Sequence, residues 1–394
     1  MSAHYQLFDH PRTFRCPSRV WFGAGGASRI PEVVQELGIK PGAALLVTDG
    51  VVDRLALARP VAEGLTAAGF ELHRYNDIPG EPSVEVADRA AELARRLSPA
   101  VVAGVGGGSV LDIAKLSAAL ARNPGSALDY TQFVGRRFAS PAVPTILVPT
   151  TAGTGSEASQ NAVVTSGPRK AFASRHPQLL ATGAILDPLL THSLPPVVTA
   201  HTGLDALSHC VEGMLSTDAT AFTDLTATQG IGLIFGALRR AYTAGEDGRA
   251  RAQMALAAYV GGLTINAGMV LGHSIAYTLA NRLHLPHGLS CALALPYTLA
   301  YNRAAGRERL EAVAVAAGRP GEDIVAHVSG LCRDVGIPDS LKGLGLERER
   351  LPELVEECME QYPRPNNPRP LAREELLSLY TAMWDGRPAQ AWTD

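Results

Sequence analysis

The feature that most constrains the fold is a change of pattern near residue 188. Before it, short apolar runs alternate with helical runs, as in parallel βαβ units. After it, long Ala/Leu-rich helical patterns continue to the end of the chain. The sequence therefore predicts an α/β domain with a doubly wound parallel sheet over 1–187, and an all-α domain over 188–394.

Individual elements of the first domain can be assigned from the same pattern. The run 51–69 predicts one helix, and Ser83 is expected to cap the next helix, with Glu85 in its first turn. The run 99–105 is almost wholly apolar, as a sheet covered on both faces requires. Strands are predicted at 43–50, 71–77, 99–105 and 144–150.

Composition limits the class of partner. A net charge of -3 gives no broad positive field, so we expect neither a nucleic-acid nor a membrane partner. The start has no apolar signal core and no run of about 18 apolar residues occurs, which predicts a cytoplasmic protein with a small-molecule substrate. The five cysteines lack C-x-x-C spacing, so we expect reduced packing residues.

Two loops after predicted strands offer phosphate-binding features. In GVGGGSVLDIAK (104–115) an apolar strand runs through glycines into a helix beginning near Ser109, where backbone amides can bind a phosphate. The loop VPTTAGTGSEAS (148–159) adds hydroxyl groups. Asp49, after the strand LLVTD, is placed to accept ribose hydroxyls and to disfavour a 2′-phosphate. Structural turns would look similar in each case, and no ATP-type P-loop motif occurs.

The strongest group of candidate ligands lies in the second half. Asp205 and His209 in TGLDALSHCVEG are four residues apart, so on a helix they share one face and can meet at one cation. His273 and His287 in GHSIAYTLANRLHLPHG would complete a set of three nitrogens and one oxygen. Such a set suits Fe(II) or Zn(II) with a position open for a substrate oxygen.

Taken together, these motifs resemble the iron-containing (group III) alcohol dehydrogenase family, which includes the maleylacetate reductases. The resemblance runs from FGAGGASRIPE (22–32) through GGGSVLDIAK, PTTAGTGSE, DPLLTHSLPP, TGLDALSHCVE and HLPHG to NNPRP (366–370). It implies a Rossmann-like domain followed by a helical domain, the two-domain architecture of dehydroquinate synthase.

The resemblance also implies cofactors and an activity. It implies a divalent metal, most often Fe(II) with Zn(II) as the alternative, on Asp205, His209, His273 and His287. It implies hydride transfer between NAD(H) and a small aldehyde or alcohol, with the metal polarising the carbonyl oxygen. The residues expected to hold NAD(H) are Asp49, Gly106, Gly107, Gly108, Ser109, Asp112, Thr150, Thr151, Thr154 and Ser156.

One position departs from the family pattern. Many relatives have H-x-x-x-H after the first of these histidines, whereas HSIAY places Tyr277 at the second position. Tyr277 could donate a proton, fill space or shape a different pocket, and the hydroxyacid-oxoacid transhydrogenase branch is similar in having tyrosine there. We assign Tyr277 and His284 as candidate catalytic residues.

The substrate and the competing functions stay open. Basic residues near the motifs, namely Lys170, Arg282, His284 and Arg369, suit an anionic carbonyl such as phosphonoacetaldehyde, maleylacetate or a semialdehyde. Surface charge accounts for each of them equally well. A transhydrogenase and a dehydroquinate synthase-like lyase are the alternatives to a dehydrogenase, and a metal-binding protein without activity is a third. Helical surfaces in the second half would allow a homodimer.

Overall fold

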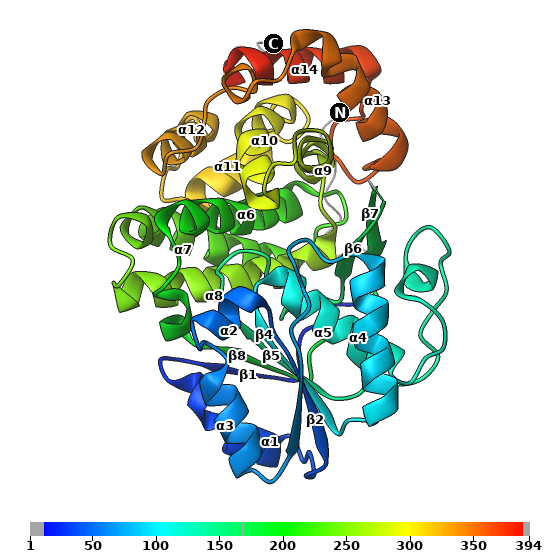
Figure 1. Cartoon of the computed structure of the whole chain (residues 1–394). Helices are drawn as coiled ribbons and strands as arrows, with labels where there is room; N and C mark the ends of the chain where they lie inside the picture. The colour runs from blue at the N-terminus through cyan, green and yellow to red at the C-terminus, as the bar shows by residue number, and fades with distance from the viewer. Residues whose placement is uncertain (1–11, 168, 389–394) are drawn as a thin grey trace. The chain divides into compact units, whose positions relative to one another are not determined.

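The computed structural model describes residues 12–167 and 169–388 (Figure 1). This part of the chain divides into two compact units. One is Arg15–Ser193, and the other holds the residues from 194 onward together with 12–14. The first unit is an α/β fold and the second is built from helices, so the predicted fold class is confirmed.

The α/β unit is built on a six-stranded parallel sheet in the order β1-β8-β5-β4-β2-β3. A separate antiparallel pair, β6-β7, follows β5 in the chain and was not predicted. The strands are β1 Arg19–Phe22, β2 Ala43–Val47, β3 Glu71–Tyr75, β4 Val101–Gly106, β5 Thr145–Pro149, β6 Ala162–Ser166, β7 Arg169–Ala173 and β8 Gly183–Leu186.

Helices cover both faces of the sheet because neighbouring side chains of a strand point to opposite faces. Leu45 and Val47 belong to one buried cluster, with side chains of α4 and α5, whereas Ala44 and Leu46 belong to another, with side chains of α1 and α3. Figure 1 shows the same two layers. The helices of this unit are α1 Ile30–Glu36, α2 Gly50–Arg54, α3 Arg59–Ala67, α4 Val84–Leu97 and α5 Gly108–Leu120.

The single helix predicted over 51–69 is wrong, because the segment forms two helices, α2 and α3. Between them Ala56 has a φ of 55°, and Pro60 lies in the first turn of α3. Proline has no N–H to donate, so it can begin α3 but could not continue α2. The cap at Ser83 is confirmed, since its side chain accepts a hydrogen bond from the Val86 amide of α4.

The second unit packs α6 closely against its neighbours. A Cβ at Gly203 would lie 2.4 Å from Leu238 of α7, and one at Gly213 would lie 2.3 Å from Thr264 of α8. Small residues therefore let α6 approach both helices. The helices are α6 Pro196–Leu215, α7 Ala221–Thr243, α8 Gly248–Thr264, α9 Leu271–Leu283, α10 His287–Tyr301, α11 Arg307–Ala316, α12 Ile324–Asp334, α13 Leu351–Gln361 and α14 Arg373–Asp385.

Short 3-10 helices join several of these elements. They are Gly26–Arg29, Ala127–Tyr130, Pro177–Leu179, Pro188–Thr191, Ile265–Ala267, Lys342–Leu344 and Arg348–Arg350. In the described residues, no single helix has both the length and the apolar content of a membrane span. The segments Gly248–Ala267 and Leu271–Leu283 have the length and apolar content of a membrane span only when they are taken together, and the chain bends by 108° between them.

Candidate metal centre and dinucleotide loop

The predicted phosphate loop lies at the carboxyl end of the parallel sheet. The chain moves from β2 outward to β3 and then crosses to β4 and β5 on the other side, so the direction of winding reverses between β2 and β4. Open α/β sheets bind ligands outside the carboxyl ends of the strands at such a reversal. Asp49 follows β2, Gly107 follows β4 and Thr150 follows β5, which brings the three predicted segments to one edge.

The two predicted cofactor loops contact each other. The Thr150 amide donates to the Gly106 carbonyl at 3.0 Å, and a Cβ at Gly108 would lie 2.6 Å from Thr154. Glycine at 108 is therefore required for this approach. No described side chain caps the start of α5 at Gly107, so its first backbone amides are available to a phosphate. This arrangement fits a dinucleotide pyrophosphate.

Two predicted cofactor residues take part in a buried polar network. Asp112 Oδ1 accepts a hydrogen bond from the Ser156 hydroxyl, and its Oδ2 accepts one from the Val163 amide at 2.9 Å. Lys115 Nζ lies 3.0 Å from Asp112 Oδ1 and donates to the Ser156 carbonyl at 3.0 Å. The network joins α5 to the loop that follows β5. Cofactor contact by Asp112 and Ser156 stays a prediction.

Asp49 performs a structural task at the end of β2. Its Oδ1 accepts hydrogen bonds from the Val51 and Val52 amides, both at 2.8 Å, and so caps α2. The contact of Asp49 with a ribose stays a prediction. Ser109, in the first turn of α5, and Thr151, in the loop after β5, are both partly exposed.

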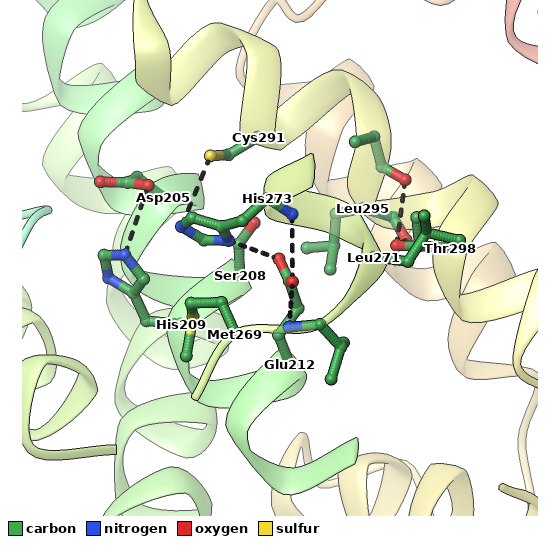
Figure 2. A network of polar contacts seen from close by, with 12 residues as sticks. Asp205, Ser208, His209, Glu212, Met269, Leu271, His273, Cys291, Leu295 and Thr298 are labelled. Carbon is green, nitrogen blue, oxygen red and sulfur yellow. Dashed lines mark hydrogen bonds and ion pairs between the residues drawn. The ribbon is translucent and has the colours of Figure 1, made fainter. Parts of the chain in front are cut away.

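The four predicted metal ligands come from three helices of the second unit. Asp205 and His209 lie four residues apart on α6, His273 is near the start of α9, and His287 is the first residue of α10. Asp205, His209 and His273 are buried, whereas His287 is 30% exposed. The side chains of α6 and α9 converge in Figure 2.

The Asp205 carboxylate lies among the imidazoles. Its Oδ1 is 3.7 Å from His209 Nε2 and 3.6 Å from His287 Nε2, and the His209 and His273 ring centroids are 5.0 Å apart. Burial raises the pKa of Asp205, but the nearby histidines outweigh it and bring the pKa below its ordinary value. Oδ1 is buried and makes no hydrogen bond to any described residue. A buried carboxylate oxygen of this kind fits a divalent cation held among these donors.

Glu212, one turn further along α6, holds His273 in place. Its Oε1 lies 2.7 Å from His273 Nδ1, and its Oε2 accepts from the His273 and Val270 amides at 3.1 and 3.0 Å (Figure 2). A Cβ at Gly272 would lie 2.5 Å from Oε1, so this close approach requires glycine. The carboxylate fixes the ring proton on Nδ1 and leaves the Nε2 lone pair toward the candidate metal centre.

Cys291 also belongs to this group, although the sequence predicted only a packing role for it. It lies one turn after His287 on α10 and is 1% exposed. Its Sγ is 3.6 Å from His287 Nε2 and 3.9 Å from His273 Nε2. Sequence reasoning missed Glu212 and Cys291, but spacing could have found both: Glu212 is three residues after His209, and Cys291 is four after His287.

The two predicted catalytic residues have different surroundings. The Tyr277 ring stacks on His287 with centroids 5.5 Å apart and meets His273 edge-on at 6.0 Å. Burial raises the pKa of the Tyr277 phenol above its ordinary value, so the phenol keeps its proton at neutral pH. His284 ends α9 with a φ of 53° and is exposed. Its catalytic role stays a prediction.

Models of one protein family match both units of the chain. A family model described as iron-containing alcohol dehydrogenase matches residues 17–188, and a model of the C-terminal part of Fe-containing alcohol dehydrogenases matches residues 199–384. Long-chain-alcohol dehydrogenase 1 of Geobacillus thermodenitrificans is 36% identical over 376 residues, covering 92% of this chain and 94% of that protein.

Two further relatives are named for one substrate. Sulfoacetaldehyde reductase of Bilophila wadsworthia is 32% identical, covering 91% of this chain and 96% of that protein. The crystal structure of sulfoacetaldehyde reductase from Bifidobacterium kashiwanohense in complex with NAD+ has a TM-score of 0.87 and 28% identity, covering 98% of this chain and 100% of that one.

Replacing Lys115 with methionine should destabilise the α/β unit. The substitution leaves the buried Asp112 carboxylate without its cation, and breaking a buried pair costs about 3 to 5 kcal/mol. Urea denaturation followed by circular dichroism measures the free energy of unfolding. Lys40→Met, at an exposed position, is the control and should have little effect. Equal stability of the two variants would contradict the role given to Lys115.

Replacing Glu212 with glutamine should weaken metal binding. The amide keeps the size of the side chain but is a poorer acceptor for His273 Nδ1–H, and losing such a partner typically costs about 10- to 100-fold in metal affinity. Competition with a chromophoric chelator measures the dissociation constant. Glu357→Gln is the matched control, because Glu357 is also buried and also bonds to α9, through Asn281. Unchanged affinity in Glu212→Gln would show that the carboxylate does not support the ligand.

Proposed function

Since the chain belongs to the iron-containing alcohol dehydrogenase family, we propose that it is a metal-dependent oxidoreductase that interconverts a small aldehyde and its alcohol with NAD(H). The observation that carries the proposal is the buried Asp205 Oδ1, which lies 3.7 and 3.6 Å from the Nε2 atoms of His209 and His287 and makes no hydrogen bond of normal length to a described residue. The proposed ligands are Asp205, His209, His273 and His287.

The two units take different parts under this proposal. The Arg15–Ser193 unit binds the dinucleotide at the start of α5, and the helical unit binds the metal. When bound, the metal supplies Lewis acidity toward the carbonyl oxygen and NADH supplies the hydride. Iron is the metal for which the family is named.

The protein supplies the positioning of the proposed ligands. Glu212 orients His273, and the stacked Tyr277 ring restricts the movement of His287. Tyr277 is a neutral phenol at neutral pH, because burial raises its pKa, and we propose that it contributes to the shape of the substrate pocket beside His287.

Steady-state assays separate this function from the alternatives. Full-length protein prepared without oxygen should contain about one divalent metal per chain and oxidise NADH in the presence of an aldehyde. A lyase would consume no NADH, and a transhydrogenase would pass hydride from a hydroxyacid to an oxoacid without net NADH turnover. His287→Ala should lower metal content and activity together. Full metal occupancy in that variant would make the ligand assignment wrong.

An anionic aldehyde is the substrate class that the residues near the centre favour. The guanidinium carbon of Arg364 lies 5.9 Å from the centroid of the Tyr277 ring, which itself stacks on His287. Arg364 Nε is buried and makes no hydrogen bond to any described residue. A carboxylate, sulfonate or phosphonate would supply the missing acceptor. Two relatives are named for sulfoacetaldehyde, which is an anion.

Three basic side chains that the sequence offered for this role have acidic partners instead. Arg282 pairs with Glu357, and Arg369 pairs with Glu375. Lys170 pairs with Glu81. Arg364 lies in a loop before NNPRP, where no periodic pattern marks it, so sequence reasoning missed it.

Replacing Arg364 with methionine should reduce the preference for anions. Loss of one charge-assisted hydrogen bond corresponds to a fall of about 10- to 100-fold in kcat/KM for an anionic aldehyde. A neutral aldehyde of the same length should be reduced at the original rate. Arg373→Met, which removes an exposed partner of Glu356, is the control. Equal losses on both aldehydes would contradict the assignment of Arg364 and leave the reductase proposal intact.

A further inference from the structure

Electron-pair donors from three helices converge at the candidate metal centre. His273 Nε2 presents a lone pair, because the ring proton lies on Nδ1 against Glu212. Asp205 Oδ1 is buried, has no hydrogen bond of normal length and angle to a described residue, and faces the Cys291 thiol. Cys291 Sγ carries one proton at most and faces both His273 Nε2 and His287 Nε2. Mutually facing donors of this kind are stabilised by a cation at their centre.

The spacing of the donors matches one coordination sphere. A tetrahedral zinc ion with bonds of about 2.3 Å to sulfur and about 2.0 Å to nitrogen places those two atoms ~3.5 Å apart. Cys291 Sγ is 3.6 Å from His287 Nε2 and 3.9 Å from His273 Nε2. The ligand atoms that all lie within 4.8 Å of one another belong to Asp205, His273, His287 and Cys291.

From this geometry we propose that Cys291 is a sulfur ligand of the metal centre, added to the oxygen and nitrogen ligands already described. The inference rests on the proposed function only in that a metal must bind at this centre. A thiol by itself would be weak support, but the buried Asp205 oxygen points into the same group. Figure 2 shows Cys291 of α10 and Asp205 of α6 on the same side of the His273 ring.

Metal binding then changes the protonation of one atom. The S–H bond of Cys291 breaks, the proton leaves to solvent, and a sulfur–metal bond forms, with no change in oxidation state. Thiolate is a soft ligand and favours Zn(II) and Co(II) over Mn(II). A centre with this sulfur should therefore select differently among divalent metals from one built of oxygen and nitrogen alone. Asp205, His209, His273, His287 and Cys291 together make five ligands, the upper limit to which zinc expands, so a substrate oxygen would bind in place of one of them.

Cobalt spectroscopy on the full-length protein tests the proposal. The metal-depleted protein is titrated with Co(II), and a thiolate ligand should give an intense sulfur-to-cobalt charge-transfer band in the near ultraviolet. The band should be lost in Cys291→Ser and retained in Cys332→Ser, which removes a buried cysteine of α12. The same replacement should lower Zn(II) affinity by a larger factor than Mn(II) affinity.

Extended X-ray absorption fine structure, measured at the zinc edge of the zinc-loaded wild-type protein, needs no variant. It should show one sulfur neighbour of the zinc at about 2.3 Å. Stoichiometric metal binding without the charge-transfer band and without that neighbour would overturn the role of Cys291 while leaving the dehydrogenase proposal in place. A band that persists in Cys291→Ser would also overturn it. Failure of the wild-type protein to bind any divalent metal would overturn both proposals.

Discussion

The buried carboxylate of Glu212 makes the hydrogen bonds on which the arrangement of the candidate metal centre depends. It accepts hydrogen bonds from the backbone before α9 and at its start, and from the His273 ring, so one side chain of α6 sets where α9 begins and how its histidine points. Desolvating a carboxylate is costly unless its oxygens are satisfied. These three donors satisfy it, and Gly272 makes the room that the contact needs.

In the α/β unit, too, a glycine permits a close approach between two segments. Gly108 lets Thr154 approach the start of α5, and the Asp112–Lys115 pair ties the loop after β5 to that helix. In both units, buried polar groups next to a glycine fix the positions of the candidate site residues. Such groups specify a geometry more sharply than apolar packing does, because an error of about 1 Å leaves a hydrogen bond unmade.

Parts of the fold and of the site could be predicted from the sequence where a hydrophobic period or a helix-capping residue indicated them. The apolar strands β4 and β5, the Ser83 cap and the facing pair Asp205 and His209 follow from local rules. The two-helix break before Pro60 was missed because the helical period continues across it. The edge strand β1 is only four residues long, so its apolar run Val20–Phe22 was too short to predict a strand.

Contacts between distant segments limited the prediction of the site. Glu212 and Cys291 lie at helical spacing from predicted ligands, yet a glutamate and a cysteine in apolar helices have common structural explanations. Arg364 reaches Tyr277 from a loop, and only the folded chain brings the two together. The family resemblance inferred from the motifs is confirmed over both halves of the chain.

All the proposed metal ligands belong to one of the two units. Metal bound to these ligands would therefore stabilise the helical unit, by an amount that grows with the logarithm of the free metal concentration. Starvation for the metal would lower the melting temperature of the helices first, and a chelator would act on this protein as a mild, selective denaturant.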